Sequence, residues 1–174
     1  MPFAIRKGDI LAKSVSITIP IDDSELEKPL TSIFNILSYE SLENQIDPDF
    51  EKHIIDIRLK PDVFRTYYKL REYDSGSYIR ALNGLVVLPV LTEAISLVLN
   101  AGDEQDSSFG KYRWYRAIVK KLKDINVDIT NCHESTMSLA NRLLGDVVND
   151  ALVVFMNVIH AEFGYGDDHG GGDE

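Results

Sequence analysis

The feature that most constrains the fold is a long apolar helical pattern near the C-terminus. Asn131 and Glu134 have the spacing of an N-cap residue and its capping-box partner. Beyond them, apolar residues continue to residue 161, which predicts one helix of about 30 residues and roughly 45 Å. Its first stripe consists of Met137, Ala140, Leu144, Val147, Ala151, Val154, Val158 and Ala161, and a second stripe of Val148, Leu152, Phe155 and Ile159 runs beside it.

This helix is apolar around most of its circumference, so it must be covered on several sides. It is also long for a domain whose compact radius should be only about 15 Å. Two arrangements satisfy these conditions: the helix is the central element of the fold, or a second chain covers part of it. The second arrangement predicts a homodimer that forms through Leu144, Val148, Leu152, Phe155 and Ile159.

Alternating apolar and polar residues indicate β-strands in the N-terminal third. The runs 14–21 and 53–60 show this period of two, and residues 3–7 fit a third strand. Between these runs, apolar residues fit a helix over 29–37, with Pro29 at its start because proline is tolerated only in the first turn. The expected sheet is small and antiparallel.

The remainder of the chain predicts helices. Residues 61–72 fit a short helix with Pro61 in its first turn better than the alternative of another strand, and 77–101 fit a longer helix with a bend at Pro89. The polar stretch 101–110 is the clearest loop. The predicted fold is therefore α+β, with the small sheet packed against three or more C-terminal helices.

Composition agrees with one globular domain. The chain has 174 residues, 44% of them hydrophobic, which favours a single domain over 1–163 with an acidic, glycine-rich tail over 164–174. The lone Cys132 excludes an internal disulfide, and the first ten residues show no signal-peptide pattern, so we expect an intracellular, cytoplasmic protein. The apolar stretch 81–100 is long enough to span a membrane, but Glu93 inside it favours a buried core helix.

A basic helix stands out against this acidic background. The chain has a net charge of -10, yet six of its 18 basic residues fall within 111–123. Wound as a helix, this stretch buries Tyr115 with its aliphatic neighbours, and Tyr112 and Trp114 lie at the two borders. The opposite face is basic. It predicts one of three roles: binding nucleic acid, contacting an acidic protein or only facing solvent. Its residues are Lys111, Arg113, Arg116, Lys120 and Lys123.

No template for chemistry is present. The four histidines are scattered, and the stretch at 132–136 lacks the second histidine of a zinc-protease motif. Cys132 and His133 are adjacent, so their side chains point about 100° apart on a helix and do not face each other. We therefore expect no catalytic residue, no metal site and no cofactor.

Three functional hypotheses follow. The leading one is a non-catalytic intracellular interaction or assembly subunit that self-associates through its last helix. The second is a nucleic-acid-associated factor that uses the basic helix, although its acidic composition argues against this class. The third is an enzyme whose site is assembled from distant residues, and a deep pocket lined by titratable groups would support it.

Overall fold

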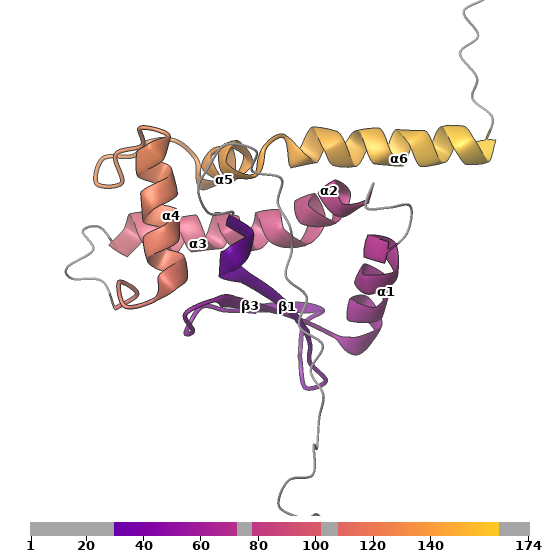
Figure 1. Ribbon diagram of the computed structural model, residues 1–174, viewed down its shortest axis with the longest axis horizontal. Coiled ribbons are helices and arrows are strands. Elements are labelled where there is room, and N and C mark those ends of the chain that lie inside the picture. The colour runs from indigo at the N-terminus through magenta and orange to yellow at the C-terminus, as the bar shows by residue number, and fades with distance from the viewer. Residues whose placement is uncertain (1–29, 73–77, 102–107, 164–174) are drawn as a thin grey trace, which may run out of the picture.

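The computed structural model describes residues 30–72, 78–101 and 108–163 (Figure 1). The strands expected at 3–7 and 14–21, and the tail, lie outside these residues. In chain order the elements are the 3-10 turn η1 (Leu30–Ile33), β1 (Phe34–Ser38), β2 (Ile46–Asp49), β3 (Ile55–Leu59), α1 (Pro61–Glu72), α2 (Ile79–Leu82), the π-helical turn η3 (Asn83–Val87), α3 (Leu88–Ala101), α4 (Arg113–Asp124), α5 (Thr136–Leu144) and α6 (Val147–Phe163).

The fold is α+β, as predicted, but the sheet is mixed rather than antiparallel. Its strand order is β1-β3-β2, with β1 parallel and β2 antiparallel to β3. A short connection joins β2 to β3, which are antiparallel neighbours. The strand β1 comes before β2 in the chain but pairs with the opposite edge of β3, so β3 is the middle strand. One face of the sheet buries Ile36, Ile55 and Ile57 against the helices.

The helix expected over 29–37 was wrong. Leu30 and Ile33 do enter the core, but they do so from a single 3-10 turn, after which the chain becomes β1. Phe34 and Ile36 are buried and Asn35 between them is only half-buried, so the local period is two. Aromatic and β-branched residues on one face favour a strand in this position.

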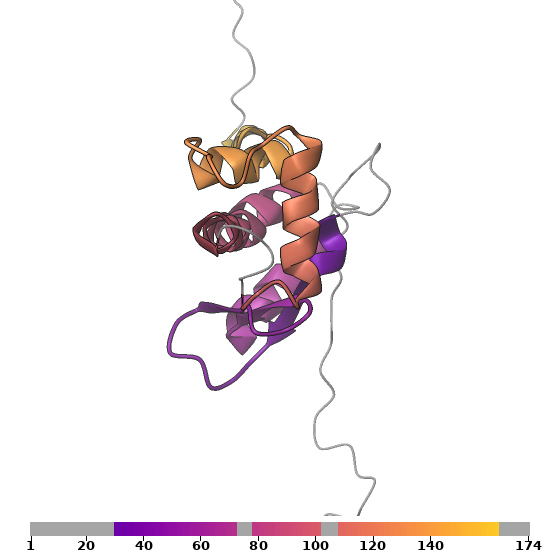
Figure 2. The same ribbon diagram turned by 90° about the vertical axis from the view of Figure 1, so that its left-hand side faces the viewer.

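The central helix is α3, and not the last helix of the chain. Figures 1 and 2 show α3 between the sheet on one side and α5 and α6 on the other, with α4 crossing it. Its buried residues include Leu91, Ala94 and Ile95, and Glu93 points outward. Among the described residues, the helical run Ile79–Ala101 is long and apolar enough to cross a membrane, but half of it is buried inside this domain. The π-helical turn η3 interrupts this run just before Pro89, where a bend was expected.

The single helix expected over 131–161 was also wrong. The chain forms two helices, α5 and α6, which meet at an angle of 68°. Gly145 lies between them with φ 76° and ψ 176°, a conformation that is essentially restricted to glycine. The cap of α5 is Ser135, whose side chain accepts a hydrogen bond from the Ser138 N–H at 3.1 Å, rather than Asn131.

Candidate functional site

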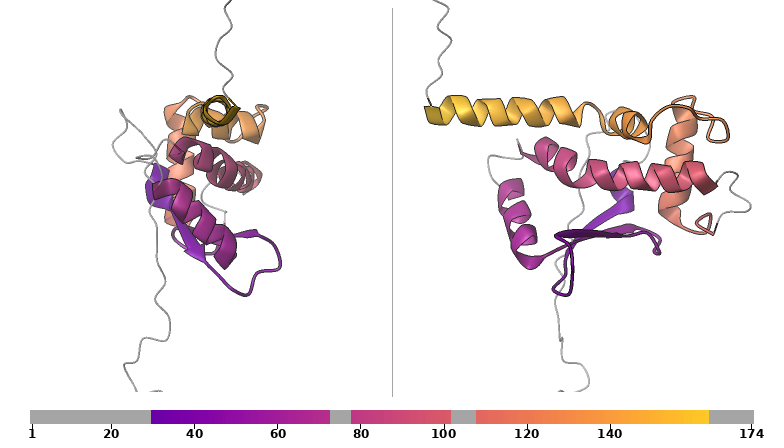
Figure 3. Two further views of the ribbon diagram at one scale, coloured as in Figure 1. Left: turned by 90° about the vertical axis from the view of Figure 1, so that its right-hand side faces the viewer. Right: turned by 180° about the vertical axis from the view of Figure 1, so that it is seen from behind.

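The break at Gly145 directs α6 along the outside of the molecule. Asp146 begins the new helix, since its side chain accepts a hydrogen bond from the Asn149 N–H at 3.4 Å. Viewed end-on in Figure 3 (left), α6 lies at the outer edge of the molecule, with α3, α1 and the sheet beneath it. Among the described residues, a helix that was expected to be covered on several sides is therefore covered on one.

The covered face of α6 packs against α2 and η3 through small residues. Val147 and Ala151 are buried there, and a Cβ atom on Gly84 would lie 3.2 Å from the carbonyl oxygen of Val147. At the same contact, Arg80 of α2 donates a hydrogen bond to Asp150 of α6 at 2.8 Å. These contacts fix the rotation of α6 about its own axis and so decide which residues face outward.

The outward face carries what we call the apolar stripe. At 100° per residue, the stripe and the covered face are centred about 120° apart around the helix. Leu152 is the most exposed member, at 59%, and no charged residue lies within the stripe. The stripe consists of Val148, Leu152, Phe155, Met156 and Ile159, each of which is at least 39% exposed.

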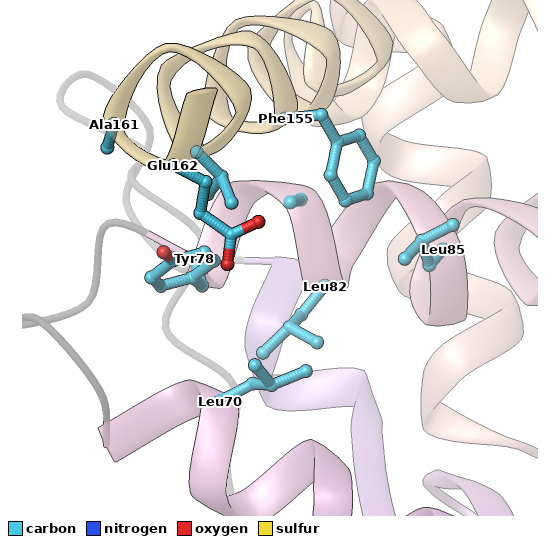
Figure 4. A pocket seen from close by; sticks show the side chains of 9 residues that line it. Leu70, Tyr78, Leu82, Leu85, Phe155, Ala161 and Glu162 are labelled. Atoms are coloured by element: carbon cyan, nitrogen blue, oxygen red, sulfur yellow. The ribbon is translucent and has the colours of Figure 1, made fainter. Parts of the chain in front are cut away.

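A groove of about 500 Å³ lies between α6 and the elements beneath it (Figure 4). Phe155 of the stripe and Leu85 of η3 lie at one end of the groove, and Glu162 and Tyr78 lie at the other. Leu70 of α1 and Leu82 of α2 line its floor, so the groove joins the stripe to further exposed apolar surface. Among the described residues that line the groove, the titratable side chains are Glu162 and Tyr78.

Four of the five predicted self-association residues lie on this exposed face. Val148, Leu152, Phe155 and Ile159 are all exposed, whereas Leu144 ends α5 and is buried in the core. Sequence reasoning missed Met156 and the exposed Leu85, which is 60% exposed. The Gly-Asp pair at 145–146 was a signal for the break, because glycine ends helices and aspartate begins them.

The basic helix was predicted correctly, apart from its aromatic borders. Lys111, Arg113, Arg116, Lys120 and Lys123 are exposed, and Tyr115, Ile118, Val119 and Leu122 are buried. Trp114 is not at a border, because it is fully buried and its indole N–H donates to the Phe50 carbonyl at 3.0 Å. Trp114 therefore cannot stack on a nucleic-acid base, and binding by this face remains a prediction.

A charged cluster covers the solvent-facing side of the sheet. Arg58 lies 3.0 Å from Asp47, and Lys52 lies 3.5 Å from Asp49 and also pairs with the buried Asp56. The hydrogen bond from Lys52 to Asp56 raises the pKa of the Lys52 ammonium. The carboxylates are thus engaged by basic side chains, and no group of three metal-ligating residues occurs in the three described ranges.

Comparison of the chain with protein-family models, with curated proteins and with solved structures gives no match. Of the surfaces described above, the apolar stripe is the one that exposes a row of large apolar side chains.

Proposed function

We propose that this chain is a non-catalytic protein-interaction or assembly subunit whose docking surface is the apolar stripe of α6. The observation that carries the proposal is the second apolar face of α6, which the described part of the domain leaves open to solvent. Each square ångström of apolar surface removed from water contributes roughly 25 cal/mol, so a row of large exposed side chains favours association. Contiguous exposed patches of this kind mark interaction sites.

The groove supports the same function. It extends the stripe toward Leu70 and Leu85 and offers a partner a recess as well as a ridge. Leu85 and Phe155 at its mouth are both large and exposed, at 60% and 46%. A large apolar side chain that anchors in a pocket is a common centre of a binding interface.

A photo-crosslinking experiment in cells that make the protein tests this proposal. In one variant the photo-reactive residue p-benzoylphenylalanine replaces Leu152 in the stripe. In the matched control it replaces Asn157, which is exposed on the opposite side of the same helix. We expect a covalent protein adduct from position 152 and none from position 157. Because both positions are exposed, neither replacement disturbs the core.

Two results would overturn the proposal. One is the absence of any protein adduct from position 152 in a folded chain, and the other is equal labelling from both positions. The adduct is identified by mass spectrometry, whatever its size. An adduct with any protein supports a docking surface, so this experiment does not presuppose that the partner is a second copy.

A further inference from the structure

We infer that the partner of the apolar stripe is a second copy of this chain, with the two α6 helices antiparallel about a two-fold axis between Val153 and Val154. This inference rests on the proposed function, since it requires the stripe to be a docking surface. It goes beyond that function in naming the occupant, the direction of the two helices and the residues that meet.

The spacing of the stripe provides the first argument. Its main members are Val148, Leu152, Phe155 and Ile159, which are separated by four, three and four residues. This is the spacing of a coiled-coil seam, in which apolar residues alternate between steps of three and four. The helix presents such a seam to solvent without a partner in the described part of the chain.

The same spacing is symmetric about its own centre. When the chain direction is reversed, four-three-four remains four-three-four, with its midpoint between Val153 and Val154. A second α6 laid antiparallel therefore places Val148 opposite Ile159 and Leu152 opposite Phe155, and each pair occurs twice. This is the reciprocal pattern that a two-fold interface requires, because residue i contacts j and j contacts i.

Glu162 decides between the two helix directions. It follows Phe155 by one heptad and therefore lies on the line of the seam. In a parallel dimer the two Glu162 carboxylates would face each other across the seam, and two negative charges brought side by side repel. In the antiparallel dimer Glu162 lies opposite Gly145 of the second copy, which has no side chain, and the two Glu162 carboxylates lie at opposite ends of the interface.

The charge of the surroundings excludes two other classes of occupant. No lysine or arginine follows Arg142 in the chain, whereas Asp146, Asp150 and Glu162 all lie on or beside α6. Helices that bind anionic membrane surfaces carry lysine and arginine along their polar face. Nucleic acids likewise require basic residues, so neither phosphate-rich surface fits α6.

The extent of the stripe sets the strength of the dimer. From Val148 to Ile159 it covers eleven residue steps, which is about 17 Å of helix. A stable interface buries about 800 Å² on each partner. The stripe has five partly exposed side chains and, with the adjoining Leu85, is small for such an interface, so we expect a monomer–dimer equilibrium in the micromolar range rather than a permanent dimer. Because the contact is apolar, salt should weaken it little.

A crosslinking experiment with paired cysteines tests the geometry. In a Cys132→Ser background, one chain carries Val148→Cys and a differently tagged chain carries Ile159→Cys, and bismaleimidoethane is added to each alone and to the mixture. We expect a crosslinked dimer in the mixture and none with either chain alone, because like positions lie about 17 Å apart in the antiparallel dimer. A dimer of either single chain by itself would indicate parallel helices and overturn the inference.

Sedimentation of the unmodified chain gives an independent readout. We expect Leu152→Glu to raise the dimer dissociation constant about tenfold or more, since it buries a charge in the seam. The control Asn157→Glu, on the opposite side of α6, should change the constant by less than about twofold. A wild-type chain that stays monomeric at 100 times the expected micromolar range (~100 µM) would overturn the inference. The photo-adduct at position 152 with a different protein would then still support the proposed function.

Discussion

Gly84 of η3 and Ala151 of α6 lie so close that a Cβ atom on Gly84 would be 3.8 Å from the Cβ of Ala151. The same atom would be 3.2 Å from the Val147 carbonyl oxygen, which is closer than most Cβ contacts allow. The approach of α6 to the domain thus depends on two small residues, one from each side.

Gly84→Val should therefore push α6 away from α2 and destabilise the fold. Overpacking of this kind costs about 1 to 3 kcal/mol of unfolding free energy, measurable by urea denaturation. The neighbouring Leu85→Ala is the control, since Leu85 is exposed and its loss should cost about 0.5 kcal/mol or less. Equal stability of Gly84→Val and the wild type would contradict the close packing.

Gly145→Ala should also destabilise the protein, for a conformational reason. Gly145 has φ 76° and ψ 176°, a region that costs a residue with a Cβ about 1 to 3 kcal/mol. In the described part of the chain, no atom beyond its two chain neighbours lies within 4 Å of a Cβ built on Gly145, so the loss is not explained by a steric clash with these residues. Denaturant unfolding measures this loss of stability, and Asn149→Ala on the exposed side of α6 is the control. A Gly145→Ala variant that is more stable than the wild type would indicate that α5 and α6 can join into one straight helix.

Tyr67 should make the domain lose stability at alkaline pH. Its side chain is buried in the core, and burial raises its pKa from 10.0 to about 12. Because the pKa of Tyr67 is higher in the folded chain than in the unfolded chain, the free energy of unfolding is unaffected by this group below pH 10. It falls as the pH rises toward 12, by roughly 2 to 3 kcal/mol in total.

Tyr67→Phe should flatten this dependence when urea unfolding is compared at pH 8 and pH 11. The variant should be at least as stable as the wild type near neutral pH, since the Tyr67 hydroxyl has no hydrogen-bond partner among the described residues. Tyr39→Phe, at an exposed tyrosine, is the control and should keep the wild-type profile. A profile for Tyr67→Phe that matches the wild type would exclude Tyr67 as the cause.

The basic face of α4 should not bind nucleic acid at physiological salt. Arg116 and Lys120 are exposed, but Trp114 is buried and cannot stack on a base, and the chain has a net charge of -10. Titration with labelled single- and double-stranded DNA and RNA, at low and physiological salt, measures this directly. Binding that falls steeply with salt and disappears in Arg116→Glu/Lys120→Glu would contradict the expectation and restore the nucleic-acid hypothesis.

Local patterns in the sequence were sufficient for several elements. The period of two over 55–59 predicted β3, and the opposed apolar and basic faces of 111–123 predicted α4 with its buried Ile118 and exposed Lys120. These predictions succeeded because side-chain direction within one element follows from the backbone period alone. The α+β class followed in the same way, from the order of the patterns along the chain.

Tertiary structure decided which apolar faces are covered. The sequence determined that residues 147–161 form a helix with two apolar stripes, but not that Gly84 and Ala151 would place one stripe against α2 and leave the other open. It likewise did not show that α3, rather than the last helix, is central, or that β1 lies parallel to β3. A helical period specifies only which residues share a face, whereas the packing of distant elements determines what that face meets.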